Sequence, residues 1–276
     1  MEKPPAIPHL YKETASGSLF YTWFGCMHTR ADLMLCCEEA KGLRIAGAIR
    51  DQLCALESAG SFFRSDSELS AVNNARCGVP TVIGTDLFRM LALCIGYRRR
   101  TGGYFDISVD SENYMPGLLE CVRLHEENSS VTLGREGIRL DLSGFIKGYA
   151  LDEVRNILET GGITDALVNL GNSSVLALGN HPRGEGWRIG IAPPAGGASP
   201  KEVVLKDACL TTSGNQTAGR LHIRSPYTGR YISGAGSVSV VTRSASEGEA
   251  LSTALFAAPP DERNGIARNF EATVYE

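Results

Sequence analysis

The stretch Asp141–Asp152 reads DLSGFIKGYALD, and it indicates how the centre of the chain folds. Two glycines, Gly144 and Gly148, stand on either side of Lys147, and apolar residues at helical spacing follow. A glycine lets the backbone pass close to a ligand because no Cβ blocks the approach. The free N–H groups at a helix start can bind an anion, and Lys147 would add a positive charge. The stretch therefore predicts a phosphate-binding turn, although a plain strand-to-helix turn with an exposed lysine has the same pattern.

The composition is that of an ordinary globular protein. The 276 residues are 43% hydrophobic and 21% charged, which allows a sizeable core in one large domain or two small ones. The net charge of -4 at pH 7 gives no electrostatic reason to expect nucleic acid or an anionic membrane as a partner. No apolar run is long enough for a membrane span, and the N-terminus lacks the apolar core of a signal peptide. We therefore expect a cytoplasmic protein, with a trimmed leader as the alternative.

The eight cysteines do not have the spacing of a disulfide framework or a zinc site. There is no C-x-x-C pair and no cysteine–histidine cluster with zinc-ligand spacing. Several cysteines lie in apolar runs, as Cys94 does in MLALCIGY, so we expect buried free thiols in a reducing compartment. The sequence also lacks a G-x-S-x-G nucleophile elbow, a G-x-x-x-x-G-K-[ST] loop and an H-E-x-x-H zinc motif.

Periodicity and turn residues predict helices and strands that mix without strict alternation. This order favours one compact α+β domain over residues 18–276, preceded by an extended or mobile arm at 1–17. Predicted helices are 38–59, one that begins at Ser65 or Ser67, one with Thr85 as its cap, 147–159, about 247–257, and a weaker one after Pro260. Predicted strands are two around Gly25 within 19–35, a hairpin of 130–133 with 138–141, then 166–170, 174–178, 187–192, 202–205, 208–211, 219–223, 237–242 and 272–275.

Three groups of polar residues could carry chemistry. Glu249 and Thr253 are four residues apart in a predicted helix, so they share a face and offer oxygen ligands to a hard cation such as Mg²⁺. Taken alone, a solvated glutamate and a threonine bonded to its own helix explain the pair better. The run LTTSG at Leu210–Gly214 ends a predicted strand in small residues, which suit the close approach of a planar ligand or phosphate, although most such runs are turns. His222 is a candidate general base, although a lone histidine is more often a packed or surface residue.

Taken in order, eight segments of the chain resemble the ApbE family of flavin transferases (FAD:protein FMN transferases). Each segment alone is weak, but their order and spacing make a specific match. The resemblance implies a single compact α+β domain with mixed, mainly antiparallel sheets and flanking helices. It also implies that the protein binds FAD and Mg²⁺ and moves the FMN half of FAD onto a Thr or Ser hydroxyl of an unidentified acceptor protein, releasing AMP. The segments are CMHTRADL at 26–33, FFRSDSELSAVN at 62–73, GGYFDISV at 102–109, DLSGFIKGYALD at 141–152, ALVNLGNSSVLALG at 166–179, TTSG at 211–214, HIRSPYTG at 222–229 and GEALSTALF at 248–256.

The resemblance implies roles for individual residues. His222 would be the base that deprotonates the acceptor hydroxyl, and Lys147 would hold either the turn or the phosphates. Glu249, Thr253 and the backbone carbonyl of Ile146 would bind the metal. The residues that would contact FAD are Met27, Ser67, Glu68, Asn73, Tyr104, Asp106, Lys147, Thr212, Ser213 and Gly214.

The chain departs from the family pattern at positions that bear on activity. Glu249 stands where the family has an aspartate, and the extra methylene moves the carboxylate by about one carbon–carbon bond, which matters because Mg²⁺ tolerates little geometric error. Ser143 replaces a usual glycine, and residues 172–174 (NSS) replace a glycine-rich run. Ser225 replaces the aspartate of a D-P-x-T-G motif. Two alternatives to a transferase therefore stay open: a catalytically impaired FAD-binding protein of the same fold, and a metal-dependent FAD pyrophosphatase.

Overall fold

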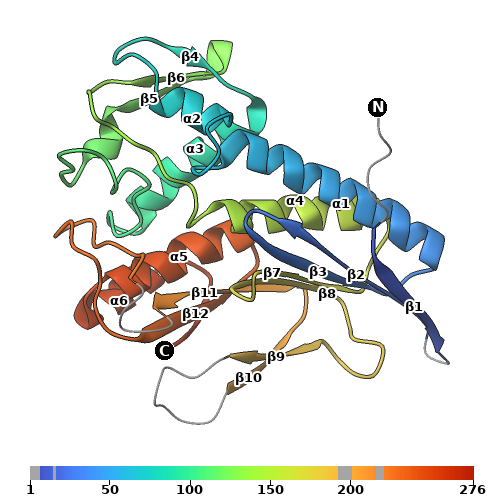
Figure 1. The fold of residues 1–276 in the computed structure, drawn as a ribbon. Helices are drawn as coiled ribbons and strands as arrows, with labels where there is room; N and C mark the ends of the chain where they lie inside the picture. The colour runs from blue at the N-terminus through green and yellow to red at the C-terminus, as the bar shows by residue number, and fades with distance from the viewer. Residues whose placement is uncertain (1–6, 15–16, 192–200, 216–220) are drawn as a thin grey trace.

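An eight-stranded antiparallel sheet spans the molecule and carries helices on one face (Figure 1). The structure is a computed structural model, and it describes residues 7–14, 17–191, 201–215 and 221–276. The strands lie in the order β1 (His9–Thr14), β2 (Gly17–Cys26), β3 (Thr29–Leu35), β7 (Ala166–Leu170), β8 (Ser174–Leu178), β11 (Ala208–Asn215), β12 (Gly236–Thr242) and β13 (Thr273–Tyr275). The helices over the sheet are α1 (Glu39–Gly60), α4 (Ile146–Thr160) and α5 (Ala245–Ala257), with α6 (Pro260–Ala267) beside α5.

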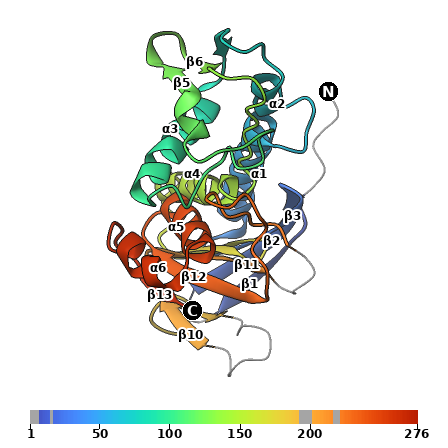
Figure 2. The ribbon, with the colours of Figure 1, turned by 90° about the vertical axis from the view of Figure 1, so that its left-hand side faces the viewer.

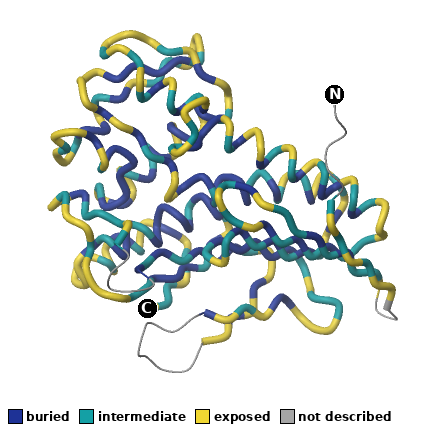
Figure 3. The backbone as a smooth tube through the Cα atoms, viewed as in Figure 1, coloured by how far each residue is buried: buried dark blue, intermediate teal, exposed yellow. Residues whose placement is uncertain are grey.

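The main hydrophobic core lies between this sheet and its helices. Along β3, Ala31, Leu33 and Leu35 are fully buried while the residues between them are not, as expected for a strand that covers a core with one face. Helix α1 meets the core with a stripe of apolar residues that includes Ile49 and Leu53. Figure 3 shows the buried backbone gathered where the helices face the sheet.

A second, smaller layer lies under the opposite face of the sheet. It consists of β9 (Trp187–Ile191) and β10 (Lys201–Leu205), which pair antiparallel. Trp187 is 2% exposed, belongs to a separate hydrophobic cluster with Val175 and Leu210 of the large sheet, and donates its indole N–H to the Leu178 carbonyl at 2.8 Å.

A small lobe lies above the helices. It contains a three-stranded sheet in the order β4 (Thr81–Val82), β6 (Ser130–Leu133), β5 (Val122–His125), with the helices α2 (Glu68–Asn73) and α3 (Thr85–Arg100) and the 3₁₀ helices η1 (Leu118–Cys121) and η2 (Glu126–Asn128). Figure 2 shows the same order of layers from the side, with the small lobe above α4 and α5 and the large sheet beneath them.

The predicted α+β class with antiparallel sheets and flanking helices is confirmed. Helix α2 begins at Glu68 with Ser67 as its cap, and Ser67 is one of the two helix starts that the sequence predicts. Helix α3 is capped by Gly84, so the prediction of Thr85 as its cap is wrong by one residue. Part of the predicted arm is a strand, because His9–Thr14 pair with β2 at the edge of the large sheet. The eight cysteines all lie in described segments and are free thiols, as expected, but only Cys26, Cys94 and Cys209 are buried, and Cys54 is exposed. Among the described residues, no helix has the length and apolar character needed to cross a membrane.

Four details of the predicted strands differ from the structure. The turn between β2 and β3 lies at Met27 and His28, with φ of 48° and 56°, as a two-residue hairpin turn requires, and Gly25 lies inside β2. Residues 138–141 form no strand, because the Asn73 side chain and the Ser111 hydroxyl bind their backbone N–H groups instead.

The other two differences concern β11 and the residues that follow it. That strand pairs with β12 as far as Asn215, so the TTSG run lies within a strand and does not end one. Residues 221–223 form no strand, and 219–220 lie outside the described residues.

Candidate functional site

The first turn of α4 lies directly against α5. Asp152 of α4 accepts hydrogen bonds from the Ser244 hydroxyl at 2.8 Å and from the N–H groups of Ala245 and Ser246 at 2.8 and 3.0 Å. Asp152 therefore caps the N-terminus of α5, where a negative charge is favourable. One turn earlier, a methyl group on Gly148 would collide with the Ala245 carbonyl oxygen and lie 2.6 Å from Glu249 Cγ. The glycine allows the two helices to approach closely, and it brings Lys147 beside the carboxylate-bearing face of α5.

A chain of polar groups joins Lys147 to Glu249. The Lys147 ammonium donates to the Ser173 hydroxyl, and the Ser174 hydroxyl donates to Oε1 of Glu249. The two serine hydroxyls are 3.3 Å apart. Burial of Glu249, which is 3% exposed, raises the pKa of its carboxyl, while the positive charge of Lys147 and the Ser174 bond oppose that rise. The site thus holds a buried carboxylate and a lysine bridged by two serines.

The hydroxyl of Thr253 extends this group toward β11. Ser213 of β11 lies on the strand face that meets α5, with its Oγ 3.0 Å from Thr253 Oγ1 and 2.8 Å from Ser252 Oγ. Thr212 points to the opposite face, as alternate strand residues do, and its hydroxyl lies 2.8 Å from Ser239 Oγ. Gly214 lies so close to the β12 backbone that any Cβ would clash with it. Of the three TTSG residues predicted to contact FAD, only the Ser213 side chain joins the group around Glu249 and Thr253.

These residues fit a magnesium ion in the nature of their ligands. Glu249 and Thr253 offer a carboxylate and a hydroxyl from one helix face, and Mg²⁺ takes one or two carboxylates and completes its shell with water and phosphate oxygens. In the described parts of the chain no three His, Cys, Asp or Glu residues cluster as a metal site, so a cation here would depend on such external oxygens. Ile146 is the first residue of α4, where a helical carbonyl accepts from the residue four positions on, and only its second lone pair could serve a metal.

The start of α4 is partly satisfied by its own turn. The N–H groups of Ile146 and Gly148 donate to the carbonyls of Leu142 and Phe145 at 2.8 and 3.0 Å. They are therefore not free for a phosphate in this conformation. The Lys147 ammonium, which faces the site through Ser173, is the positive group that this turn supplies to an anion.

Several predicted FAD contacts use their polar groups to hold the fold. The Ser67 hydroxyl donates to the Ser61 carbonyl at 2.6 Å and caps α2, and the Asn73 amide binds both backbone groups of Leu140. Glu68 accepts from the Gly84 N–H at 2.6 Å. These three residues lie in the small lobe, and none of them contacts the group around Glu249.

The remaining predicted contacts lie at the borders of the small lobe. Asp106 accepts from Arg98 at 3.0 Å and from Ser108, and its side chain is fully buried. The Tyr104 ring packs on that of Tyr227 with centroids 4.6 Å apart. The Met27 N–H, in the β2–β3 turn, donates to Glu57 at 3.0 Å.

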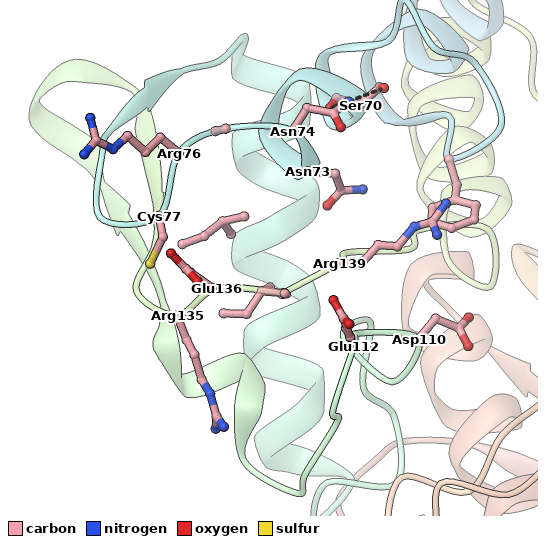
Figure 4. Close-up of a pocket in the computed structure, with 15 residues that line it drawn as sticks. Ser70, Asn73, Asn74, Arg76, Cys77, Asp110, Glu112, Arg135, Glu136 and Arg139 are labelled. Carbon is pink, nitrogen blue, oxygen red and sulfur yellow. Dashed lines mark hydrogen bonds between the residues drawn. The ribbon is translucent and has the colours of Figure 1, made fainter.

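A cavity of about 760 Å³ opens in the small lobe (Figure 4). Asn73 is the predicted FAD contact among its lining residues, and Glu249, Lys147 and Thr253 do not line it. Two lining residues, Asp110 and Arg139, lie toward Asp141, whose pKa is raised first by burial and then by the nearby Asp110 charge. The residues that line the cavity therefore do not include the group around Glu249.

His222 lies at the open end of a short hairpin. We call residues 222–234 the His222 hairpin, because the Ile232 N–H donates to the Ile223 carbonyl at 2.9 Å and Arg224 forms a β-bridge with Tyr231. His222 itself is exposed. The hairpin meets the small lobe through an ion pair of Arg224 with Asp110, at 2.9 Å.

Sequence reasoning missed the residues that support the group. Ser173, Ser174 and Ser252 were not among the predicted site residues, although Ser173 and Ser174 were recognised as departures from a glycine-rich run. That departure was the available signal, because hydroxyls replace glycines at the same site where a longer Glu249 replaces an aspartate.

Comparison with known proteins identifies the family. The family model described as "ApbE family" matches residues 27–117 and 115–275. The chain belongs to the ApbE family. Curated relatives include proteins named FAD:protein FMN transferase from Treponema pallidum, 26% identical over 75% of this chain and 69% of that one, and from Vibrio cholerae, 26% identical over 77% and 70%.

Solved structures of the family share the fold. The apo flavinyl transferase ApbE of Pseudomonas stutzeri superposes with a TM-score of 0.82 at 22% identity, covering 93% of this chain and 89% of that one. The flavin transferase ApbE of Vibrio cholerae gives a TM-score of 0.81 at 21% identity, covering 97% and 93%.

Proposed function

We propose that the protein transfers FMN from FAD to a Thr or Ser hydroxyl of an acceptor protein in a magnesium-dependent reaction that releases AMP. One observation carries the proposal: Lys147 of α4 and the pair Glu249 and Thr253 of α5, about 100 residues further along the chain, converge where α4, α5 and β11 meet. Membership of the ApbE family, whose curated relatives are named FAD:protein FMN transferases, supports the same reaction.

The chemistry is a displacement at the phosphorus of the FMN half. The acceptor oxygen forms a new P–O bond, the P–O–P linkage breaks, and AMP leaves with the bridging oxygen. In the proposed mechanism His222 takes the hydroxyl proton, and the Lys147 ammonium balances negative charge on the phosphates. Glu249 is 3% exposed and accepts from Ser174, so its carboxylate is held in place before a ligand binds.

Glu249 and Thr253 would hold Mg²⁺, with a carbonyl from the central turn, predicted at Ile146, as a further ligand. When bound, the ion would neutralise charge on the pyrophosphate oxygens and on the departing AMP. Ser174 donates to one oxygen of Glu249, so cation binding must either share that oxygen or use the other.

The Ser174 bond also favours a second candidate, an FAD-binding protein in which transfer is impaired. If Glu249 keeps its hydrogen bond and coordinates poorly, FAD would still bind, because binding a dinucleotide uses many contacts besides the metal. Hydrolysis of FAD by water is the third outcome that the same site chemistry allows.

One assay distinguishes the three candidates. The protein is incubated with FAD, Mg²⁺ and a peptide that carries an acceptor threonine, and the peptide is examined for flavin fluorescence on a denaturing gel. Labelled peptide supports transfer, AMP and FMN without label indicate hydrolysis, and bound FAD without either product indicates binding alone. Glu249→Gln should abolish the magnesium-dependent reaction and magnesium binding measured by calorimetry. Glu247→Gln, on the same helix but paired with Arg100, is the matched control.

A further inference from the structure

The His222 hairpin is fixed to the small lobe at two points. At its tip, the Tyr227 hydroxyl donates to the Gly102 carbonyl at 2.5 Å. In its first leg, Arg224 pairs with Asp110 at 2.9 Å. The Tyr227 contact lies at the opposite end of the hairpin from His222, whereas Arg224 is two residues from His222 on the same leg. Neither contact involves the end of the return leg, at residues 232–234.

A side chain of the large sheet holds the open end. Nδ2 of Asn215 donates to the Ile232 carbonyl at 2.8 Å and to the Gly234 carbonyl at 3.1 Å. Ile232 in turn binds Ile223, the neighbour of His222. Asn215 therefore fixes the return leg of the hairpin beside the residue that is proposed to act as the base.

The same strand carries the other side of the site. Asn215 and Ser213 are two residues apart in β11, so their side chains lie on the same face, about 7 Å apart along the strand. Ser213 contacts Thr253 on that face. Asn215 is 3% exposed, and it pairs with Gly236 of β12 at the end of a strand whose first half, Ala208–Thr211, also pairs with β8. The backbone that carries the Asn215 amide is therefore part of the large sheet.

The chemistry of the amide explains why asparagine stands here. Both partners are carbonyl oxygens, so the NH₂ group must face them, and this orientation leaves Oδ1 buried with no hydrogen-bond partner among the described residues. An unsatisfied buried acceptor is unfavourable for stability. A neutral group that donates two hydrogen bonds from one atom is what the position requires, and asparagine supplies it at a length that reaches both carbonyls.

We propose that Asn215 is a positioning residue of the transfer site: by clamping the His222 hairpin to β11, it sets the distance between His222 and the Ser213–Thr253 group. This inference rests on the proposed function. Asn215 acts through His222 and not through FAD, so its loss should affect the chemical step and leave FAD binding unchanged.

The test is a double-mutant cycle with Asn215→Asp, which keeps the size of the side chain and removes both donors. We expect kcat for peptide labelling to fall about 10- to 100-fold, because a base displaced by a small distance loses much of its effect. The KM for FAD and the FAD affinity measured by flavin fluorescence should stay unchanged. In a His222→Ala background, Asn215→Asp should cause no further loss, because the two residues act as one unit.

A second measurement does not depend on activity. Trypsin should cleave after the exposed Arg230, within the hairpin, several-fold faster in Asn215→Asp than in the wild type. Asn269→Asp is the matched control, because Asn269 also donates to a backbone carbonyl, that of Arg100 at 2.8 Å, away from the site. Asn269→Asp should change neither kcat for peptide labelling nor the rate of trypsin cleavage after Arg230. If Asn215→Asp does not fold, Asn215→Ser enters the same cycle.

The outcomes separate the two proposals. A wild type that binds FAD but never labels the peptide would overturn the proposed function, and the trypsin comparison would still decide whether Asn215 clamps the hairpin. If the wild type transfers FMN and the losses from Asn215→Asp and His222→Ala simply multiply, the positioning role is wrong. A weaker FAD affinity in Asn215→Asp, or unchanged cleavage at Arg230, would overturn it as well.

Discussion

The Glu249 carboxylate is the least favourable group in the site for stability, and its neighbours show how the fold retains it. It is 3% exposed, and burial without partners would cost a charged group several kcal/mol. Ser174 donates to Oε1, and Lys147 supplies a positive charge through Ser173. The serines that depart from the family pattern therefore support the glutamate that departs from it.

Removing the Ser174 hydroxyl should therefore destabilise the folded protein. We expect Ser174→Ala to lower the free energy of unfolding by about 1.5–3 kcal/mol, the usual value for a hydrogen bond to a charged group. Ser252→Ala is the control, because its hydroxyl is equally buried but binds Ser213 and the Glu249 backbone carbonyl, so its loss should cost about 1 kcal/mol. Urea titrations of both variants test this, and equal losses would show that the carboxylate does not depend on Ser174.

The stability contribution of Asp141 should depend on pH. Burial raises the pKa of its carboxyl in the folded state, and the neighbouring Asp110 charge adds to that rise. Below the unfolded pKa of about 3.9, both states bind the proton and the group contributes nothing. As the pH rises toward the folded pKa, the unfolded state releases its proton first, so the folded state loses stability, and this loss stays constant at higher pH.

Asp141→Asn removes that loss and keeps an oxygen to accept from the Ser143 N–H, now at 2.7 Å. We expect the variant to match the wild type in melting temperature near pH 3.5 and to exceed it at pH 7. Melting curves at several pH values measure the difference in melting temperature between the two proteins. If the melting temperature of the wild type rises relative to that of the variant as the pH increases, the argument is wrong.

At the scale of single residues, sequence reasoning identified the groups with distinctive spacing. Glu249 and Thr253 were predicted from their i, i+4 positions, and they lie together. Ser67 was predicted both as a helix start and, through the family resemblance, as an FAD contact. The structure confirms the helix start, because Ser67 caps α2 and its hydroxyl donates to the Ser61 carbonyl. A side chain's partner in space is not encoded in its local pattern, which is why the Ser174–Glu249 bond, between residues 75 positions apart, could not be predicted.

At the scale of elements, α4 and α5 decide the site because they approach closely at Gly148. The two glycines of the central stretch differ here. A Cβ on Gly148 would collide with the α5 backbone, whereas a Cβ on Gly144 would meet nothing within 4 Å. Neither residue has a positive φ, so the difference between them is one of space alone.

Alanine at the two positions should therefore have opposite effects. Gly148→Ala should lower the free energy of unfolding by about 1–3 kcal/mol through overpacking against α5, despite the better helix propensity of alanine. Gly144→Ala should be neutral or stabilise by up to about 1 kcal/mol, because it restricts the unfolded chain. Urea midpoints measure both, and a shift of the same sign and size in the two variants would show that Gly148 is not a helix contact.

The elements that were predicted well are those with strong local signals. Helix α4 was expected at 147–159 and spans Ile146–Thr160, because an apolar stripe lies between glycines. The turn at Met27 and His28 was missed because non-glycine residues adopt positive φ there, which the fold imposes. Residues 138–141 alternate like a strand, but side chains from distant segments take their backbone N–H groups, and no local pattern reveals that competition.

At the scale of the whole molecule, the layers differ in how much they depend on one another. The large sheet and its helices share one extensive core, while β9 and β10 pack on the other face through a separate small cluster (Figures 1 and 3). A two-stranded sheet is marginal by itself, so this layer relies on the large sheet for its stability. The site, which lies on the helix side, does not include residues of this layer.

Trp187→Ala should therefore release β9 and β10 and leave the site intact. The substitution removes the largest side chain of the small cluster and its hydrogen bond to the Leu178 carbonyl. It should lower the free energy of local opening of β9 and β10 by about 3–5 kcal/mol and leave the stability of the main core unchanged. Hydrogen exchange should become fast in 187–191 and 201–205, with β8 and β11 still protected, and FAD with Mg²⁺ should raise the melting temperature as much as in the wild type. Leu53→Ala, in the main core, should instead speed exchange throughout the large sheet. If Trp187→Ala also exposes β11 or removes the ligand-dependent shift, the two layers unfold as one unit and the site depends on both faces of the sheet.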